Sequence, residues 1–273
     1  MTARLLNIPG DDYFDLDAFS ASAAKTVIAR SPAHARANYR KAPTKAIERG
    51  DIIGRLLLGA GKDYEVVNAA NWQTNKAKAD RDAIRAAGKV PVLVDDLEDY
   101  HKAAEAIRLN LAERDIILDG ASEQAITWVE HTEYGDVTCK GRFDHVWPDI
   151  GIILDLKVTH DASPKAVEKT AENLGYAIQS AAYSRALAAF DPDLAGRVAF
   201  MFVFAEAEEP YAVNISEPDG IFREIGERRW LRACSTWAKC IRDNHWPSYG
   251  PDTNPITAPQ WALRNEGYSS DEI

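Results

Sequence analysis

The sequence predicts an α/β protein: a mixed β-sheet flanked by helices, preceded by a helical N-terminal section. Residues 1–118 are rich in Ala, Leu, Lys and Arg, and their apolar residues mostly recur at three- to four-residue spacing, as in helices. After residue 118, β-prone segments appear and then alternate with helical ones. No flexible linker separates the parts, so we expect one integrated domain with an N-terminal section (1–118), a core (119–245) and a tail (246–273).

The N-terminal section is expected to be helical throughout, with breaks at Ser31-Pro32 and at Gly88 to Pro91. Its predicted helices are Asp15–Arg30, Ala33–Arg40, Ala46–Gly59, Lys76–Ala87 and Asp95–Leu111.

The core is predicted to begin with three strands and to continue as helix, strand and helix. The predicted strands are Gln124–His131, Val137–Val146, Ile152–Val158 and Arg197–Phe204. The predicted helices are Gly175–Phe190 and Gly220–Asn244, and Ser163-Pro164 is a further helix start. The tail, which holds four prolines, is expected to be a loop.

The charge and cysteine content set limits on the class of protein. The net charge is −10, yet residues 21–58 hold eight Lys and Arg against two acids, which suits a basic face for a nucleic acid or a solvated helical face equally well. The three cysteines form no CxxC pair, and no apolar run approaches the roughly 20 residues that span a bilayer. We therefore expect a cytoplasmic protein without a membrane partner.

The stretch from Gly141 to Val158 carries the residues on which a functional prediction depends. Side chains alternate across a strand, so Asp155 and Lys157 are expected on one face of their strand. A hairpin that turns between the last two of the first three strands brings Asp144 beside Asp155. An acid and a lysine inside an apolar strand are costly to bury unless they are used.

Two carboxylates this close repel each other and favour a cation between them. Oxygen ligands with few histidines select Mg²⁺ or Mn²⁺ over zinc. Such a site suits phosphodiester hydrolysis, with Lys157 placed to orient or activate the attacking water or to stabilise the transition state. The alternative is structural: a buried Asp155–Lys157 ion pair with Asp144 at the surface.

These motifs resemble the PD-(D/E)XK nuclease superfamily and, within it, the exodeoxyribonuclease VIII (RecE-like) branch of phage and prophage exonucleases. The likeness spans nearly the whole chain. It lies in CKGRFDHV (139–146), ILDLKVTHDASP (153–164), GYAIQSAAYSRAL (175–187), SPAHARANY (31–39), WPSYG (246–250) and APQWA (258–262).

The resemblance implies roles for individual residues. Metal ligands are expected to be Asp144, Asp155, the main-chain carbonyl of Leu156 and Glu123, the last directly or through water. The catalytic group is expected to be Lys157 with Asp155, Asp144 and Gln179. The QxxxY motif of the family matches Gln179 and Tyr183, and with Tyr176 these residues can share one helix face and position DNA or the lysine. For the tyrosines, core packing is the alternative, and for Glu123 it is an exposed strand end.

One motif departs from the family pattern. The family carries GxxxH on an N-terminal helix, with the histidine as a metal ligand, whereas here Gly54 stands in the histidine position after Gly50. Asp51, Glu48 or His34 are the candidates to compensate.

The resemblance implies hydrolysis of DNA by an exonuclease that acts on linear duplex ends in phage-type recombination or repair. Arg36 and Arg40 of the basic segment are expected to contact the DNA. A homo-oligomer and a single-strand annealing protein as partner are further expectations, as is a phage- or prophage-encoded protein in a bacterial host. The alternatives are a catalytically silent DNA- or protein-binding module and a site-specific endonuclease on the same fold.

Overall fold

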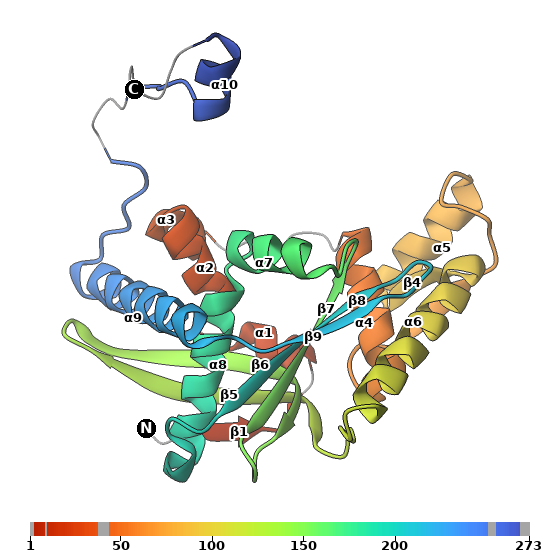
Figure 1. Cartoon of the computed structure of the whole chain (residues 1–273), viewed down its shortest axis with the longest axis horizontal. Helices are drawn as coiled ribbons and strands as arrows, with labels where there is room; N and C mark the ends of the chain where they lie inside the picture. The colour runs from red at the N-terminus through yellow and green to blue at the C-terminus, as the bar shows by residue number, and fades with distance from the viewer. Residues whose placement is uncertain (1–2, 9, 38–43, 251–254, 268–273) are drawn as a thin grey trace.

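The computed structural model describes residues 3–8, 10–37, 44–250 and 255–267, and a seven-stranded mixed sheet is its centre (Figure 1). The strand order is β1-β5-β6-β7-β8-β9, and β2 pairs with β6. The strands are β1 (Arg4–Leu6), β2 (Phe19–Ser20), β5 (Ala121–Thr132), β6 (Gly135–Trp147), β7 (Ile152–Thr159), β8 (Ala199–Glu206) and β9 (Val213–Ser216). A separate two-stranded parallel sheet consists of β3 (Tyr64–Val67) and β4 (Val90–Leu93).

Helices pack against both faces of the main sheet. The described helices are α1 (Gly10–Asp15), α2 (Ala21–Ala29), α3 (Pro32–Arg36), α4 (Lys45–Leu58), α5 (Asn75–Ala86), α6 (Val94–Ala112), α7 (Pro164–Asn173), α8 (Tyr176–Phe190), α9 (Gly220–Asp243) and α10 (Gln260–Asn265). A short 3₁₀ helix covers Pro192–Leu194. In Figure 1, α4, α5 and α6 lie at one end of the molecule, and α2, α3, α8 and α9 gather at the other. No described helix has the length and apolar character needed to cross a membrane.

The strand β7 lies at the centre of the sheet and is antiparallel to β6 and parallel to β8. The β5–β6 hairpin turns at Gly135, whose φ of 124° glycine adopts readily and other residues rarely do. The parallel pairing of β7 with β8 needs a long connection, and α7 with α8 supply it. The strand that carries Asp155 and Lys157 is therefore an interior strand, with a paired neighbour on each side.

Two hydrophobic cores lie on opposite faces of this sheet. Trp128 and Trp230 belong to the core beneath α2, α8 and α9, and Ile153 of β7 points into it. Leu154 belongs to the other core, where α4 and α6 pack, and Leu156 packs against its edge. Residues of the N-terminal section contribute to both cores, which ties that section to the sheet.

The predicted fold class is confirmed, and the long predicted helices and strands of the core are present. The N-terminal section is not helical throughout, however. The segment predicted as the helix Asp15–Arg30 contains the end of α1, the strand β2 and then α2, and the section also holds β1, β3 and β4. These strands have two to four residues each, so pairing with distant partners decides their structure and local propensity does not. The tail predicted as a loop contains α10, and β9 was not predicted.

Candidate active site

Three acidic residues occupy neighbouring register positions across β5, β6 and β7. In the β5–β6 ladder, Glu123 and Asp144 lie at opposite positions but are not paired, although the residues on both sides of them are. The β6–β7 ladder ends at the pair His145 and Leu154, one position before Asp144 and Asp155. Glu123 has a φ of 53°, which residues other than glycine rarely adopt. Backbone strain of this kind concentrates at functional sites. Glu123, Asp144 and Asp155, called the acidic row below, are therefore a candidate site.

The side chain of Asp144 accepts a main-chain hydrogen bond from β7 at the point where the β6–β7 ladder has ended. Its Oδ2 accepts from the main-chain N–H of Leu156 at 2.8 Å. Burial raises the pKa of the half-buried Asp144 to about 7, and the charges of Asp155 and Glu123 act in the same direction, whereas Lys157 and the Leu156 hydrogen bond oppose the rise. The expected proximity of the two aspartates is therefore present, and it carries an electrostatic cost.

Asp155 and Lys157 share the face of β7 that is covered by α8. Asp155 is only 1% exposed, and its Oδ2 is in contact with the Lys157 ammonium. Burial favours the neutral amine, but the carboxylates of Asp155 and Asp144 outweigh it and raise the pKa of Lys157. Leu154 and Leu156 face the opposite core, as the alternation predicts.

The N-terminal half of α8 completes this group. Gln179 Nε2 donates to Asp155 Oδ1 at 2.6 Å. Tyr176 stacks on Phe202, with ring centroids 5.6 Å apart, and its ring lies 4.9 Å from the Lys157 ammonium. Two of the three α8 residues that the sequence singles out therefore surround the acid–lysine pair.

Tyr183 lies deeper than the other two. It is 8% exposed and contacts Phe143 edge to face, and its hydroxyl accepts from the main-chain N–H of Arg142 at 3.5 Å. A Cβ at Gly141 would come within 2.9 Å of its ring. This burial favours core packing over contact with DNA.

Glu123 forms an ion pair with Arg142, from Oε2 to Nε at 3.0 Å. Burial raises the pKa of Glu123, Arg142 opposes the rise, and Asp51 of α4 adds to it. Asp51 in turn is 3.6 Å from the ammonium of Lys62. Glu123 thus influences Asp144 through its charge, which raises the pKa of Asp144, while its direct ion-pair partner is Arg142.

The structure separates the three candidates for the missing histidine. At Gly54 an added Cβ would meet nothing closer than 3.9 Å, so α4 offers space but no ligand there. Glu48 is engaged by Arg85 through hydrogen bonds of 2.7 and 2.9 Å. His34 lies on α3 and shares a 2.6 Å hydrogen bond with the residue that caps that helix. Only Asp51 belongs to the charged group around the three acids.

The donor set fits a hard divalent cation in part. Asp144 and Asp155 supply carboxylate oxygens, and Asp155 Oδ2 is buried without a regular hydrogen bond. Leu156 directly follows Asp155 in β7 and adds a main-chain carbonyl, and oxygen donors of this kind suit Mg²⁺ or Mn²⁺. Among the described residues, no three His, Cys, Asp or Glu side chains come close enough to form a metal site together. The candidate ligands are therefore the two aspartates and the carbonyl, with Glu123 held apart by Arg142.

Lys25 of α2 is a member of the site that the sequence does not single out. Its ammonium donates to Gln179 Oε1 at 2.8 Å and lies 5.0 Å from the ring of Tyr176. Lys25 is 154 positions from Gln179 in the chain, so no local pattern links the two residues. The only sequence signal was its place in the basic N-terminal segment.

The predicted DNA-contacting arginines lie outside this group. Arg36 is exposed on α3, and its guanidinium lies 4.4 Å from the ring of Trp246. Arg40 lies outside the described residues. A contact of these arginines with DNA stays a prediction.

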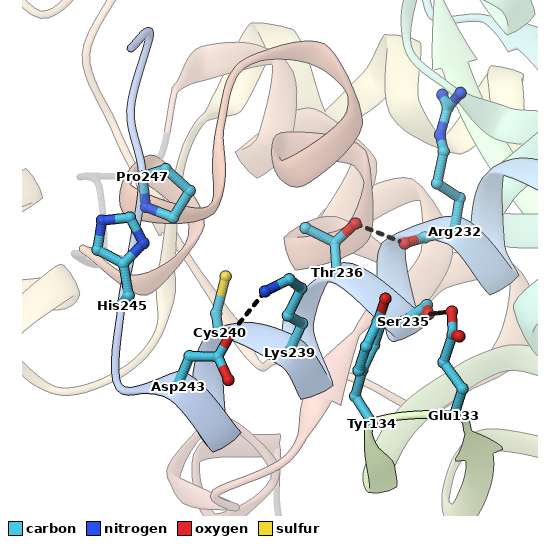
Figure 2. Close-up of a pocket in the computed structure, with 10 residues that line it drawn as sticks. All are labelled: Glu133, Tyr134, Arg232, Ser235, Thr236, Lys239, Cys240, Asp243, His245 and Pro247. Carbon is cyan, nitrogen blue, oxygen red and sulfur yellow. Dashed lines mark hydrogen bonds and ion pairs between the residues drawn. The ribbon is translucent and has the colours of Figure 1, made fainter. Parts of the chain in front are cut away.

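A surface pocket elsewhere is a poor match for a catalytic site (Figure 2). It lies between α9 and the tip of the β5–β6 hairpin, and the residues that line it include Tyr134, Lys239 and Asp243. Its lysine is already paired with Asp243 at 2.5 Å. No residue of the acidic row lines it.

Two solved structures match this chain, and the first of them has a similar fold. A crystal structure of a proposed exonuclease from Eubacterium rectale is similar, with 14% identity and a TM-score of 0.57, over 96% of this chain and 99% of that one. A phage-related exonuclease from Haemophilus somnus 129PT matches at 13% identity and a TM-score of 0.35, over 83% of this chain and 96% of that one. No curated protein matches the chain.

The domain family described as a PDDEXK-like domain of unknown function (DUF3799) matches residues 20–256. This range contains the acidic row, the lysine and the whole of α8. The predicted resemblance to the PD-(D/E)XK superfamily is confirmed, and the chain belongs to this PDDEXK-like domain family.

Proposed function

We propose that the protein is a metal-dependent DNA nuclease that acts as an exonuclease on linear duplex ends. The observation that carries the proposal is the separation of β6 and β7, which sets Asp144 against Asp155 with Lys157 on the same face of β7. A structural ion pair would need only one acid. The second acid adds repulsion, which a cation would relieve.

In this proposal Asp144, Asp155 and the Leu156 carbonyl hold Mg²⁺ or Mn²⁺, which supplies an activated water and neutralises phosphate charge. Gln179 orients the Asp155 carboxylate through its 2.6 Å hydrogen bond. Lys157, whose raised pKa keeps it an ammonium, orients the water or balances charge that develops on the phosphate.

The direct test incubates the protein with end-labelled linear duplex, with Mg²⁺, Mn²⁺ or a chelator. We expect nucleotide release that requires the metal and is abolished by Lys157→Ala. Lys165→Ala is the matched control, because Lys165 lies exposed on α7 and its loss removes the same charge. Equal activity in wild type and Lys157→Ala would contradict the proposal.

A second measurement separates the alternatives. Closed circular duplex is spared by an exonuclease and cut by a site-specific endonuclease. The glycine at position 54 favours a third reading, a catalytically silent DNA- or protein-binding module. Calorimetric titration with Mg²⁺ or Mn²⁺ decides this point, since a silent module shows no binding that depends on Asp144 and Asp155.

The further expectations follow from the family resemblance alone. A homo-oligomer, a single-strand annealing protein as partner, a role in phage-type recombination and a cytoplasmic location in the host stay predictions. Size measurement in solution tests the first of them.

A further inference from the structure

Lys25 reaches the site from a helix that belongs to the N-terminal section. Its side-chain stem passes the start of α8, where a Cβ at Gly175 would come within 3.2 Å of Lys25 Cγ. Gly175 has a φ of 63°, and it precedes the first residue of α8. The bare backbone at this glycine therefore leaves a path for the lysine toward Gln179.

The two ends of the Gln179 amide are engaged by different partners. Oε1 accepts from Lys25 at 2.8 Å, and Nε2 donates to Asp155 at 2.6 Å. An amide turned by 180° would place Nε2 against the lysine and Oε1 against the carboxylate, so both hydrogen bonds would be lost. Lys25 and the Asp155 carboxylate thus favour the same amide orientation, each from its own end of the Gln179 side chain.

Lys25 and Lys157 engage the same acid in different ways. Lys157 contacts Asp155 directly, whereas Lys25 meets it through the Gln179 amide, and both ammonium groups lie close to the ring of Tyr176. Burial lowers the pKa of Lys25 to about 7, and the charge of Lys157 adds to this effect while Asp155 opposes it. An amine keeps N–H donors in either protonation state, so its hydrogen bond to Oε1 persists through neutral pH.

We propose that Lys25 is a positioning residue that holds the Gln179 amide in the orientation that donates to Asp155. In this way α2 takes part in the alignment of a carboxylate on β7. The kinetic consequence of this inference rests on the proposed nuclease function, but its structural content does not.

The first experiment observes the amide itself in the metal-free protein. In protein labelled with ¹⁵N-glutamine, the side-chain NH₂ signal of Gln179 is assigned by its absence in Gln179→Ala. We expect Lys25→Met to move this signal toward that of a solvent-exposed glutamine, and Lys25→Arg to restore it. Lys165→Met, which removes a lysine on exposed α7, leaves it in place.

An unchanged Gln179 signal in Lys25→Met would overturn the proposal. Should this variant not fold, as judged by thermal unfolding, Lys25→Gln gives the same test, because its shorter side chain cannot span the distance to Oε1. This experiment needs no metal, DNA or turnover.

The second experiment is a double-mutant cycle on nuclease activity. Residues that orient metal ligands typically contribute about 10- to 100-fold to activity, so we expect Lys25→Met to lower kcat about tenfold with little change in KM. In a Gln179→Ala background the same substitution is expected to cause no further loss, since the residue acts through the amide.

Additive losses with a raised KM would overturn the positioning role and assign Lys25 to a direct phosphate contact. If the wild-type protein shows no metal-dependent nuclease activity, the proposed function fails, and the amide signal still decides the role of Lys25. The two failures are therefore distinguishable.

Discussion

Two carboxylates of the same sheet, Glu130 on β5 and Asp155 on β7, are buried beside a cation, yet hydrogen bonds satisfy them to different degrees. Glu130 accepts from the indole N–H of Trp128 and of Trp230, each at 3.0 Å, and from Arg185 at 2.9 and 2.7 Å. Burial alone would raise the pKa of Glu130, but these hydrogen bonds outweigh it and lower the pKa. Both carboxylate oxygens of Glu130 therefore accept hydrogen bonds from protein groups.

Within the described part of the chain, Asp155 accepts one hydrogen bond, from Gln179, besides its contact with Lys157. A second acid, Asp144, lies next to it with a pKa raised to about 7 by burial and by Asp155 itself. A buried acid with all its acceptors engaged is a structural element, while paired acids with spare acceptors keep capacity for a ligand. The comparison therefore indicates a packing role for Glu130, and it supports the proposed catalytic role of the acids that include Asp155.

The largest expected effect is the loss of activity on neutralising the acidic row. Asp155→Asn is expected to lower nuclease activity by about 10³-fold or more, because it removes a charged ligand from the site. Asp144→Asn is expected to do the same while leaving the protein equally stable or more stable, since it removes like-charge repulsion. Turnover of end-labelled duplex and thermal unfolding measure the two effects. A strongly destabilised but fully active Asp144→Asn would reverse the comparison.

Glu130→Gln is expected to give the opposite pattern. It breaks a buried ion pair, and the cost is about 3 kcal/mol, at the low end for such pairs, because Arg185 keeps Glu227 at 2.9 Å as a partner. Activity per folded molecule should stay unchanged. Urea unfolding measures the first and kcat the second, with Glu227→Gln as the control that removes only the exposed partner. A loss of kcat without a loss of stability would place Glu130 in the site.

The pH dependence of stability distinguishes the two acidic groups further. The pKa of Asp144 rises from 3.8 to about 7 on folding. Between these values the folded state binds more protons than the unfolded state, so stability falls as pH rises, by less than about 1.4 kcal/mol per pH unit. Above pH 7 this contribution is constant.

Urea unfolding of the metal-free protein at pH 5, 6, 7 and 8 measures this slope. Asp144→Asn should remove most of it, and the raised pKa of Glu123 leaves a smaller slope of the same sign. The lowered pKa of Glu130 has the other sign: its stabilisation is present above the unfolded pKa and is lost only as pH falls through the folded value, so it leaves this window flat. An unchanged slope in Asp144→Asn would contradict this prediction.

The part of the site on β6 and β7 was predictable because it depends on short-range rules. The two-residue period of a strand sets Asp155 and Lys157 on one face, and one hairpin brings in Asp144. The sequence also predicted the α8 face that carries Gln179.

The rest depends on contacts between distant segments. Lys25 contacts Gln179 only because α2 packs on α8. Glu123 pairs with Arg142 at a position of β5 where the backbone departs from strand geometry. The strands β3 and β4 pair with each other although α5 separates them in the sequence. Each has four residues, which is too short for a periodic pattern to show. Burial of Tyr183 beneath Gly141 likewise follows from packing, which residue spacing does not reveal.

The smallest expected effect concerns Gly54, where the family histidine is absent. A Cβ there meets nothing closer than 3.9 Å, and a helix-interior glycine costs roughly 0.5–1 kcal/mol relative to alanine. Gly54→Ala should therefore raise the free energy of unfolding by about that amount, and so should Gly50→Ala, the matched control on the same helix, where a Cβ meets nothing within 4 Å. Urea unfolding and nuclease activity are measured for both. If only Gly54→Ala lost activity, the bare backbone at position 54 would be needed for close approach of substrate, because helix stability changes equally in the two variants.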